Sequence, residues 1–433
     1  MKTEEKEKLS IEEVGSILQV NKYGNVDQSV ENYVRVLLSD PDLAGVIKVN
    51  ELTGQKDIVS EVSWKRNTLS MTDVDDDFIY HLIEKRYGLK SDRLLKKAIN
   101  IVSNSNSYHP IKDYLETLEW DGVERIKDLL PKYLGAEKSD ITAWAMKTTM
   151  LGMLSRIYNP GCKFELMMCL VGGQGAGKSS FFRLLAIRDE WFTDDLRRID
   201  DENVYRKIKG HWIVELDEMT ATMRSKFIED IKAFISRQVD VYKVPYEVHP
   251  KDIKRQCVFT GTSNNMQFLP FDRSGNRRFI PVPVDAAKAE CHPLADEKAA
   301  REFIRMCWAE ALVIFKSGNF SFVVPKEIEE RLTQMQKDFM PEDNISGLIE
   351  AWLEDCPEEY VCSTMIYHKA VAPLSTERPN QFVIKEIAEV MNAMDGWEKV
   401  SSHRFSEYGT QRAWKRKSDF IPIGDEKNLP WAE

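Results

Sequence analysis

The sequence lacks any segment suited to a membrane or to export. No apolar run approaches the roughly 18 residues that a transmembrane helix needs, and residues 1–8 are mostly charged, without the apolar core of a signal peptide. The seven cysteines are scattered and never spaced as C-x-x-C, and the seven histidines do not cluster with them. We therefore expect a cytoplasmic protein with reduced thiols, no structural zinc and no membrane contact.

Basic residues are outnumbered by acidic ones. The 433 residues include 60 lysines and arginines against 70 aspartates and glutamates, a formal net charge of −10. Such a surface does not wrap nucleic acid over its whole extent, so any contact with nucleic acid must come from local basic patches. Hydrophobic residues make up 42% of the chain, enough to build the cores of about two to four globular domains.

A glycine-rich segment between a buried strand and a helix is the most informative motif. The apolar run 166–171 predicts the strand, and the pattern at 180–186 predicts the helix. In a phosphate-binding loop of this kind, Lys178 reaches the β- and γ-phosphates and Ser179 binds Mg²⁺. We therefore predict a site for ATP and Mg²⁺; the alternative is a glycine-rich structural turn. The predicted nucleotide-binding residues are Gly172, Gly173, Gln174, Gly175, Ala176, Gly177, Lys178, Ser179 and Ser180.

A second buried segment, 212–218, ends in acidic residues. A strand that ends in adjacent carboxylates beside a phosphate loop suits one acid that holds Mg²⁺ and another that polarises the attacking water. By position, Asp217 is assigned to the metal and Glu218 to the water. Glu215 interrupts the apolar strand and is an alternative acid facing the nucleotide, so all three remain candidates. The competing interpretation is an edge strand with solvated acids.

Two later segments are candidates for contacts with the γ-phosphate. An apolar stretch from Cys257 ends in a polar tip at Asn264, where ring ATPases place a residue that senses the γ-phosphate. Arg277 and Arg278 lie on a turn before a predicted strand at 279–282. A guanidinium fixed on a turn can stabilise charge on a transferring phosphoryl group. The alternative is a pair of surface arginines in ion pairs.

A β-hairpin pattern separates the acidic strand from Asn264. Residues 239–246 form one predicted arm, 247–252 the tip, and 253–260 the return arm. The charge of this hairpin predicts contact with single-stranded DNA; the alternative is an exposed hairpin that covers the core. The candidate DNA-binding residues are Lys243, His249, Lys251, Lys254 and Arg255.

The regions before the ATPase predict two further parts. Residues 1–28 are polar without a sustained period and predict a mobile leader, whereas residues 29–160 predict a mostly helical N-terminal domain. The acidic run 75–77 follows Thr72 and indicates the N-terminus of a helix rather than the metal site of a primase or nuclease. Residues 161–340 form the predicted ATPase domain, which an amphipathic helix closes.

Residues 341–433 predict a small C-terminal module. Two helical patterns, at 345–353 and 382–394, precede a basic and aromatic ending, which suggests a winged-helix-like fold. A basic patch on such a module would contact the phosphates of duplex DNA at an origin; a solvated basic face is the alternative. The basic residues of this patch are Arg404, Arg412, Lys415, Arg416 and Lys417.

The motifs also occur in a recognisable order. They are Tyr108–Leu115, Trp120–Gly122, Pro160–Cys162, the phosphate loop, Trp191–Asp194, Val214–Met219, Ile231–Arg237, Asp240–Tyr246, Arg255–Asn264 and Gly275–Phe279. In this order the chain resembles the virulence-associated protein E family of phage, plasmid and genomic-island P-loop ATPases. That family is similar to superfamily 3 helicases and to the helicase part of poxvirus-type primase-helicases. The resemblance covers roughly residues 30–283.

The resemblance implies a fold and an activity. The fold is α/β, with a P-loop ring-ATPase core of the superfamily 3 helicase type between the two flanking parts. The activity is that of an ATP-driven DNA helicase, a homo-oligomer expected to be a hexamer, which unwinds DNA during replication initiation. Because no primase fits before residue 30, a separate primase is an expected partner. The alternatives are a nucleotide-gated DNA-binding scaffold or loader, and a small-molecule P-loop kinase, which the long hairpin disfavours.

The resemblance also bears on single residues. The superfamily pattern has a lysine and then an aspartate after the acidic strand, and Lys232 and Asp240 match it here. Gln238 and Val239 replace the glycines that usually precede that aspartate, so the loop shape departs from the pattern. The family favours glutamates at both 215 and 218, which strengthens Glu215 as a catalytic or metal-binding acid.

Overall fold

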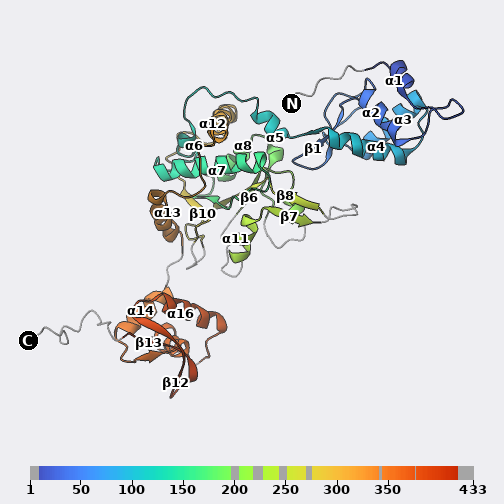
Figure 1. Ribbon diagram of the computed structural model, residues 1–433. Helices are drawn as coiled ribbons and strands as arrows, with labels where there is room; N and C mark the ends of the chain where they lie inside the picture. The colour runs from blue at the N-terminus through green and yellow to red at the C-terminus, as the bar shows by residue number, and fades with distance from the viewer. Residues whose placement is uncertain are drawn as a thin grey trace, which may run out of the picture. The chain divides into compact units, whose positions relative to one another are not determined.

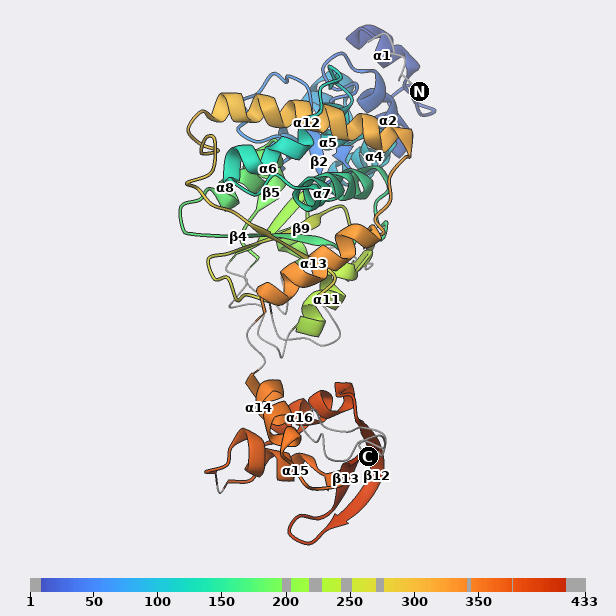
Figure 2. The ribbon, with the colours of Figure 1, turned by 90° about the vertical axis from the view of Figure 1, so that its left-hand side faces the viewer.

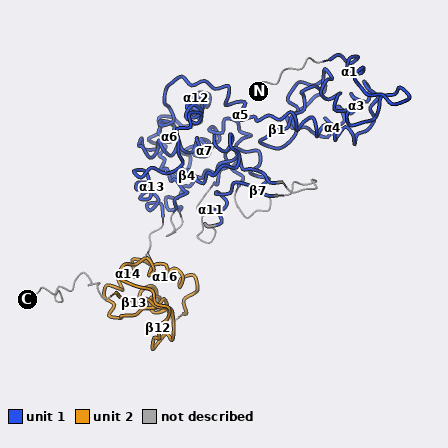
Figure 3. Tube along the Cα trace, viewed as in Figure 1, with its two compact units in different colours: residues 1–340 blue, residues 341–433 orange. Residues whose placement is uncertain are grey.

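The computed structural model describes residues 9–196, 204–217, 228–242, 251–269, 276–340, 344–375 and 377–417. The chain divides into two compact units, residues 1–340 and 341–433 (Figure 3). Across the described ranges, none of the helices combines the length and the apolarity that crossing a bilayer requires.

The first unit begins with a small layer of helices and strands that has its own hydrophobic core. Val14, Val36 and Ile83 are among its fully buried residues. A three-stranded sheet in the order β2-β1-β3 completes it. Its elements are α1 (Ile11–Ile17), α2 (Val30–Ser39), β1 (Ile47–Asn50), β2 (Lys56–Ile58), α3 (Asp73–Tyr87), α4 (Asp92–Ser105) and β3 (Ser107–Tyr108).

Two of the sequence predictions concern this region and can be compared with its structure. The predicted mobile leader is wrong from residue 9 onward, because Ser10 and Glu13 form a capping box at the start of α1 and Val14 is fully buried. The helix interpretation of the acidic run is confirmed. Asp75 caps α3 by accepting hydrogen bonds from Thr72 and from the indole of Trp64.

A five-stranded parallel sheet forms the centre of the first unit. Its order is β10-β4-β9-β6-β5, and every neighbouring pair runs parallel. Parallel strands are buried on both faces and therefore consist of near-continuous apolar runs, as the sequence of β4 does. The strands are β4 (Met167–Val171), β5 (Phe192–Thr193), β6 (Ile213–Leu216), β9 (Val258–Ser263) and β10 (Phe279–Pro283).

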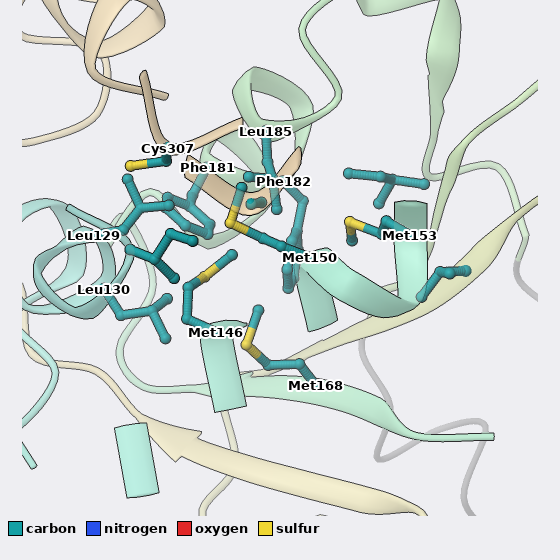
Figure 4. Packing of buried hydrophobic residues seen from close by; sticks show 14 of the residues in the cluster. Leu129, Leu130, Met146, Met150, Met153, Met168, Phe181, Phe182, Leu185 and Cys307 are labelled. Carbon is teal, nitrogen blue, oxygen red and sulfur yellow. The ribbon is translucent and has the colours of Figure 1, made fainter. Parts of the chain in front are cut away.

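Helices cover both faces of this sheet (Figures 1 and 2). Methionines of α7 pack against Met168, Phe181 and Phe182 on one face (Figure 4), and α9 and α11 cover the other. The helices on the first face are α5 (Pro110–Leu115), α6 (Ile126–Leu134), α7 (Asp140–Tyr158), α8 (Lys178–Leu185) and α12 (Glu297–Ser317). The remaining helices are η1 (Asp189–Trp191), α9 (Val204–Ile208), α11 (Ile228–Ser236) and α13 (Lys326–Asp338).

The predicted division at residue 160 does not follow the hydrophobic cores. Buried residues of the N-terminal core end at Val102, and from Ile111 onward α5, α6 and α7 pack into the core of the parallel sheet. The reason is that α7 is buried on nearly all sides and needs neighbours around its whole circumference. Sequence periodicity placed the helix but not its packing partners.

The predicted hairpin is present, with a different return arm. β7 (Val239–Tyr242) pairs antiparallel with β8 (Lys251–Lys254), and Val239 lies opposite Lys254. The predicted single arm 253–260 is wrong: the chain leaves the hairpin after Lys254 and enters the central sheet as β9 at Val258. Arg255, at this junction, is buried.

The second unit has its own core, in which Ile349, Ile366, Ile387 and Trp414 are buried. Its three-stranded antiparallel sheet has the order β11-β13-β12. The elements run α14 (Asn344–Glu354), β11 (Tyr360–Val361), α15 (Ser363–Ile366), the π-helix η2 (Tyr367–Val371), α16 (Gln381–Ala393), β12 (Trp397–Phe405) and β13 (Gly409–Arg416).

Candidate active site

The glycine-rich loop follows β4 at the carboxyl edge of the parallel sheet. Gly175 and Gly177 both have φ of +80°, a conformation that side-chain-bearing residues rarely adopt, and Gly177 leads directly into α8. A cavity of about 340 Å³ opens beside the loop. Its lining consists of residues 174–180, Asp217, residues 262–264 and His292. The carboxyl ends of β4, β6 and β9 therefore meet at one cavity.

Lys178 is buried and extends back over the loop. Its Nζ donates hydrogen bonds to the carbonyl oxygens of Gly172 and Gly173, at 2.8 and 2.9 Å, and to Oδ1 of Asn264 at 2.9 Å. Burial lowers the pKa of Lys178, while Glu215 and Asp217 nearby oppose that shift. The ammonium group is held by three neutral acceptors at the cavity, where an incoming anion would complement its charge.

Glu215 is the central acid of the site. Its Oε1 accepts hydrogen bonds from Ser179 Oγ at 2.7 Å and from Thr262 Oγ1 at 2.6 Å, and the residue is fully buried. Oε2 is buried with no hydrogen-bond partner among the described residues. Burial raises the pKa of Glu215 to about 7. A buried carboxylate oxygen left unpaired beside a serine hydroxyl fits a divalent cation, which would replace the proton.

The other two predicted acids differ from Glu215. Asp217 follows the end of β6, is exposed and lines the cavity, with its Oδ1 3.2 Å from Thr262 Oγ1. Glu218 lies outside the described residues. Within the described ranges, no group of three or more histidine, cysteine or acidic side chains is placed to hold a metal. Mg²⁺ sites commonly use one or two carboxylates together with phosphate oxygens, so the arrangement suits that ion.

Arg277 and Arg278 lie at the opposite edge of the sheet from the loop. They precede β10, which runs parallel to β4, whereas the glycine-rich loop follows β4. Arg278 donates to Ser236 Oγ at 2.9 Å and pairs with Glu165 at 3.6 Å. Arg277 is 74% exposed and lies 3.8 Å from the same glutamate. The structure does not bring these arginines to the loop of their own chain.

The candidate DNA-binding residues of the hairpin are only partly described. Lys243 and His249 lie outside the described residues, as does the side chain of Lys251, and Lys254 is exposed. The prediction that Arg255 contacts DNA is wrong for this conformation. Its guanidinium is buried, pairs with Asp240 through Nε at 2.9 Å and Nη2 at 2.5 Å, and donates to the carbonyl of Phe234.

The C-terminal basic residues also divide into two groups. Arg416 donates to the carbonyl oxygens of Leu353 and Cys356 and so ties β13 to the end of α14, whereas Lys415 forms a surface ion pair with Glu359 at 3.4 Å. Arg404 and Arg412 are exposed on the β12–β13 hairpin.

Sequence reasoning missed two residues of this site. Thr262 belongs to the polar tip that pointed to Asn264, and its polar side chain near the carboxyl end of β9 is a usable signal. His292 lies in the connection between β10 and α12, where no local pattern marks it.

Comparisons with known proteins give the chain a family. The family model of the virulence-associated protein E-like domain matches residues 115–341, more than half of the chain. Among solved structures, the chain is similar to the apo structure of the NrS-1 C-terminal region (305-718), with 14% sequence identity, a TM-score of 0.46, and coverage of 86% of this chain and 96% of that chain. An A-form apo structure of the NrS-1 C-terminal region matches with 15% identity, a TM-score of 0.45 and the same coverage. No curated protein matches. The extent of the family match shows that this chain belongs to the virulence-associated protein E-like domain family.

Proposed function

We propose that this chain is a Mg²⁺-dependent ATPase that assembles into a ring and drives a replicative DNA helicase of a phage, plasmid or genomic-island type element. One observation carries the proposal. Lys178 contacts Asn264, and Ser179 contacts Glu215, so the glycine-rich loop, the acidic strand and the polar tip meet at one cavity. Membership of the family supports the same function.

Each residue has a proposed role in binding or hydrolysis. The backbone of residues 172–177 and the amine of Lys178 bind the phosphates, and Asn264 contacts the γ-phosphate. Ser179 and Glu215 hold Mg²⁺, with Asp217 as the outer carboxylate, and Glu218 orients the attacking water. When bound, the ion would neutralise charge on the phosphates. The unpaired Oε2 of Glu215 supports this assignment.

The arginine position supports a shared site in a ring, which we propose to be a hexamer. A side chain at the opposite sheet edge cannot serve its own loop, but it can reach the loop of a neighbouring subunit. Arg277 is the better candidate for this role, since it is 74% exposed, whereas Arg278 is 20% exposed and bonded to Ser236.

DNA contacts are proposed at two places. Lys243, His249, Lys251 and Lys254 of the hairpin would contact a single strand in the ring channel. In the second unit, the order α14, β11, α15 with η2, α16 and a long hairpin supports a winged-helix-like fold with β12–β13 as the wing. The exposed Arg404 and Arg412 on this wing would contact the phosphates of an origin duplex.

A nucleotide-gated scaffold that loads other replication proteins is the second candidate. The burial of Arg255 favours it, because the hairpin then offers one less charge to DNA than the motor proposal assumed. Strand displacement on a forked duplex with Mg²⁺ and ATP separates the two. Displacement by the wild type and its loss in Lys178→Ala support the motor. ATP-dependent DNA binding without displacement supports the scaffold, and no ATP binding by the wild type rejects both.

A further inference from the structure

The connection between β10 and α12 brings a histidine to the edge of the glycine-rich loop. A Cβ built on Gly177 would lie 2.9 Å from Nε2 of His292 and 2.8 Å from Cδ of Pro293. These contacts are tighter than carbon atoms tolerate, so the connection lies directly against the loop where α8 begins. His292 is exposed at the cavity, and its ring is part of the cavity wall.

The hydrogen bonding of the His292 ring indicates which of its two nitrogens carries the proton. Nδ1 of His292 accepts a hydrogen bond from the backbone N–H of Leu294 at 3.2 Å. A ring nitrogen that accepts carries no proton, so in the neutral ring Nε2 is the donor. Among the described residues, Nε2 has no hydrogen-bond partner. The N–H donor at Nε2 thus lies beside Gly177, on a ring that lines the cavity.

Contacts with the end of α6 also hold the connection between β10 and α12 in position. The backbone N–H of Asp285 donates to Leu134 at 3.0 Å, and that of Glu290 donates to Lys132 at 2.9 Å. The side chains of Lys132 and Glu290 form an ion pair at 3.0 Å. Gly135 permits this approach, because a Cβ there would lie 2.0 Å from the carbonyl oxygen of Asp285. The end of α6 therefore fixes the segment that carries His292.

The sheet order places His292 and Asn264 on different sides of the loop. β9, which ends before Asn264, pairs with one side of β4, and β10, which leads to His292, pairs with the other. Lys178 and Asn264 mark the γ-phosphate end under the proposed function. A nucleotide whose phosphates lie along the loop then has its nucleoside toward His292.

We propose that His292 donates a hydrogen bond from Nε2 to the nucleoside half of the bound nucleotide, at its sugar or base. This inference rests on the proposed function, since it needs the phosphates to occupy the loop. His292 then distinguishes a nucleotide from a bare polyphosphate, a task that the loop itself cannot perform because it contacts only phosphate oxygens.

Titration calorimetry of the full chain with Mg²⁺ and ATP, ADP or inorganic tripolyphosphate tests the proposal. His292→Phe keeps a ring but removes the donor, and His292→Gln keeps an N–H donor. We expect His292→Phe to weaken ATP and ADP binding about fivefold, the usual worth of one neutral hydrogen bond, with tripolyphosphate affinity unchanged. His292→Gln should stay close to the wild type. His81→Phe, at an exposed histidine of α3, is the matched control.

The outcomes separate this inference from the proposed function. Wild-type ATP affinity in His292→Phe overturns the inference, as does an equal loss in His292→Phe and His292→Gln. An equal loss of tripolyphosphate affinity moves the contact to the phosphates and also overturns it. A wild type that binds neither ATP nor tripolyphosphate counts against the proposed function instead. Retained tripolyphosphate binding shows in the same experiment that the variants are folded.

Discussion

The hydroxyl of Ser179 donates to Oε1 of Glu215 over 2.7 Å and joins two segments that lie 36 residues apart in the chain. Ser179 belongs to the first turn of α8 and Glu215 to β6, so the contact joins the end of the glycine-rich loop to the acidic strand across β9. Thr262 of β9 donates to the same oxygen and completes the connection. Two neighbouring strands, β6 and β9, and the start of α8 therefore position one carboxylate.

Substituting Glu215 should separate binding from hydrolysis. We expect Glu215→Gln to bind ATP but to lose about 100-fold or more in Mg²⁺-dependent hydrolysis, because the amide cannot replace a carboxylate that holds the ion. Steady-state phosphate release measures the rate. Glu302→Gln, at an exposed acid of α12, should hydrolyse ATP like the wild type. Hydrolysis by Glu215→Gln within about twofold of the wild type would remove this acid from the mechanism.

The same carboxyl group predicts a pH dependence of stability without Mg²⁺. The pKa of Glu215 is raised to about 7 in the folded protein, whereas an unfolded glutamate has its ordinary pKa of 4.5, so the folded protein keeps this proton to a higher pH. Between these values the folded state binds more protons, so the free energy of unfolding falls as the pH rises. The contribution is at most about 1.4 kcal/mol per pH unit.

Denaturant unfolding with a chelator at several pH values between 5 and about 7.5 measures this slope. Glu215→Gln does not titrate and should lack that component, so its stability should fall less than that of the wild type across this window. Parallel profiles for the two proteins would show that Glu215 titrates normally in the folded state.

Mixing inactive variants tests the shared site. If Arg277 acts on a neighbouring subunit, Arg277→Ala should lose about 10³-fold or more in hydrolysis. Mixing it with Lys178→Ala should restore part of the activity, because some interfaces then combine an intact loop with an intact arginine. Phosphate release across a series of mixing ratios gives the measurement. Arg278→Ala is the comparison, and rescue with it but not with Arg277→Ala would exchange the two assignments.

Two adjacent basic residues of the hairpin should behave oppositely. Arg255→Ala leaves Asp240 buried without its partner, so we expect about 3–5 kcal/mol of destabilisation. Lys254→Ala, at an exposed residue, should change the free energy of unfolding by less than about 0.5 kcal/mol. It should, however, reduce the slope with which single-strand affinity falls as the salt concentration rises. Denaturant unfolding and binding at several salt concentrations measure the two effects. A stable Arg255→Ala protein with weakened DNA binding would restore Arg255 to the DNA surface.

Local patterns predicted the elements better than their partners. The strand before the loop, the loop glycines and α8 are contiguous, so their sequence contains the information. The sequence could not decide between Glu215 and Asp217, because that choice depends on where β6 ends. The strand stops at Leu216, so Glu215 is enclosed by neighbouring strands and Asp217 is not. The burial of Arg255 depended on Asp240, and a pairing across a hairpin cannot be recognised from one basic residue in an apparently exposed arm.

The separate core of the second unit has a consequence for replacing that unit by another. The buried cluster around Ile387 and Trp414 draws all its described members from residues 345–414, so it needs no side chain of the first unit. Recombination between Met340 and Asn344 would join a different C-terminal module without disturbing either core. Under the proposed function, such an exchange would replace the hairpin that carries Arg404 and Arg412 and leave the residues of the candidate ATPase site unchanged.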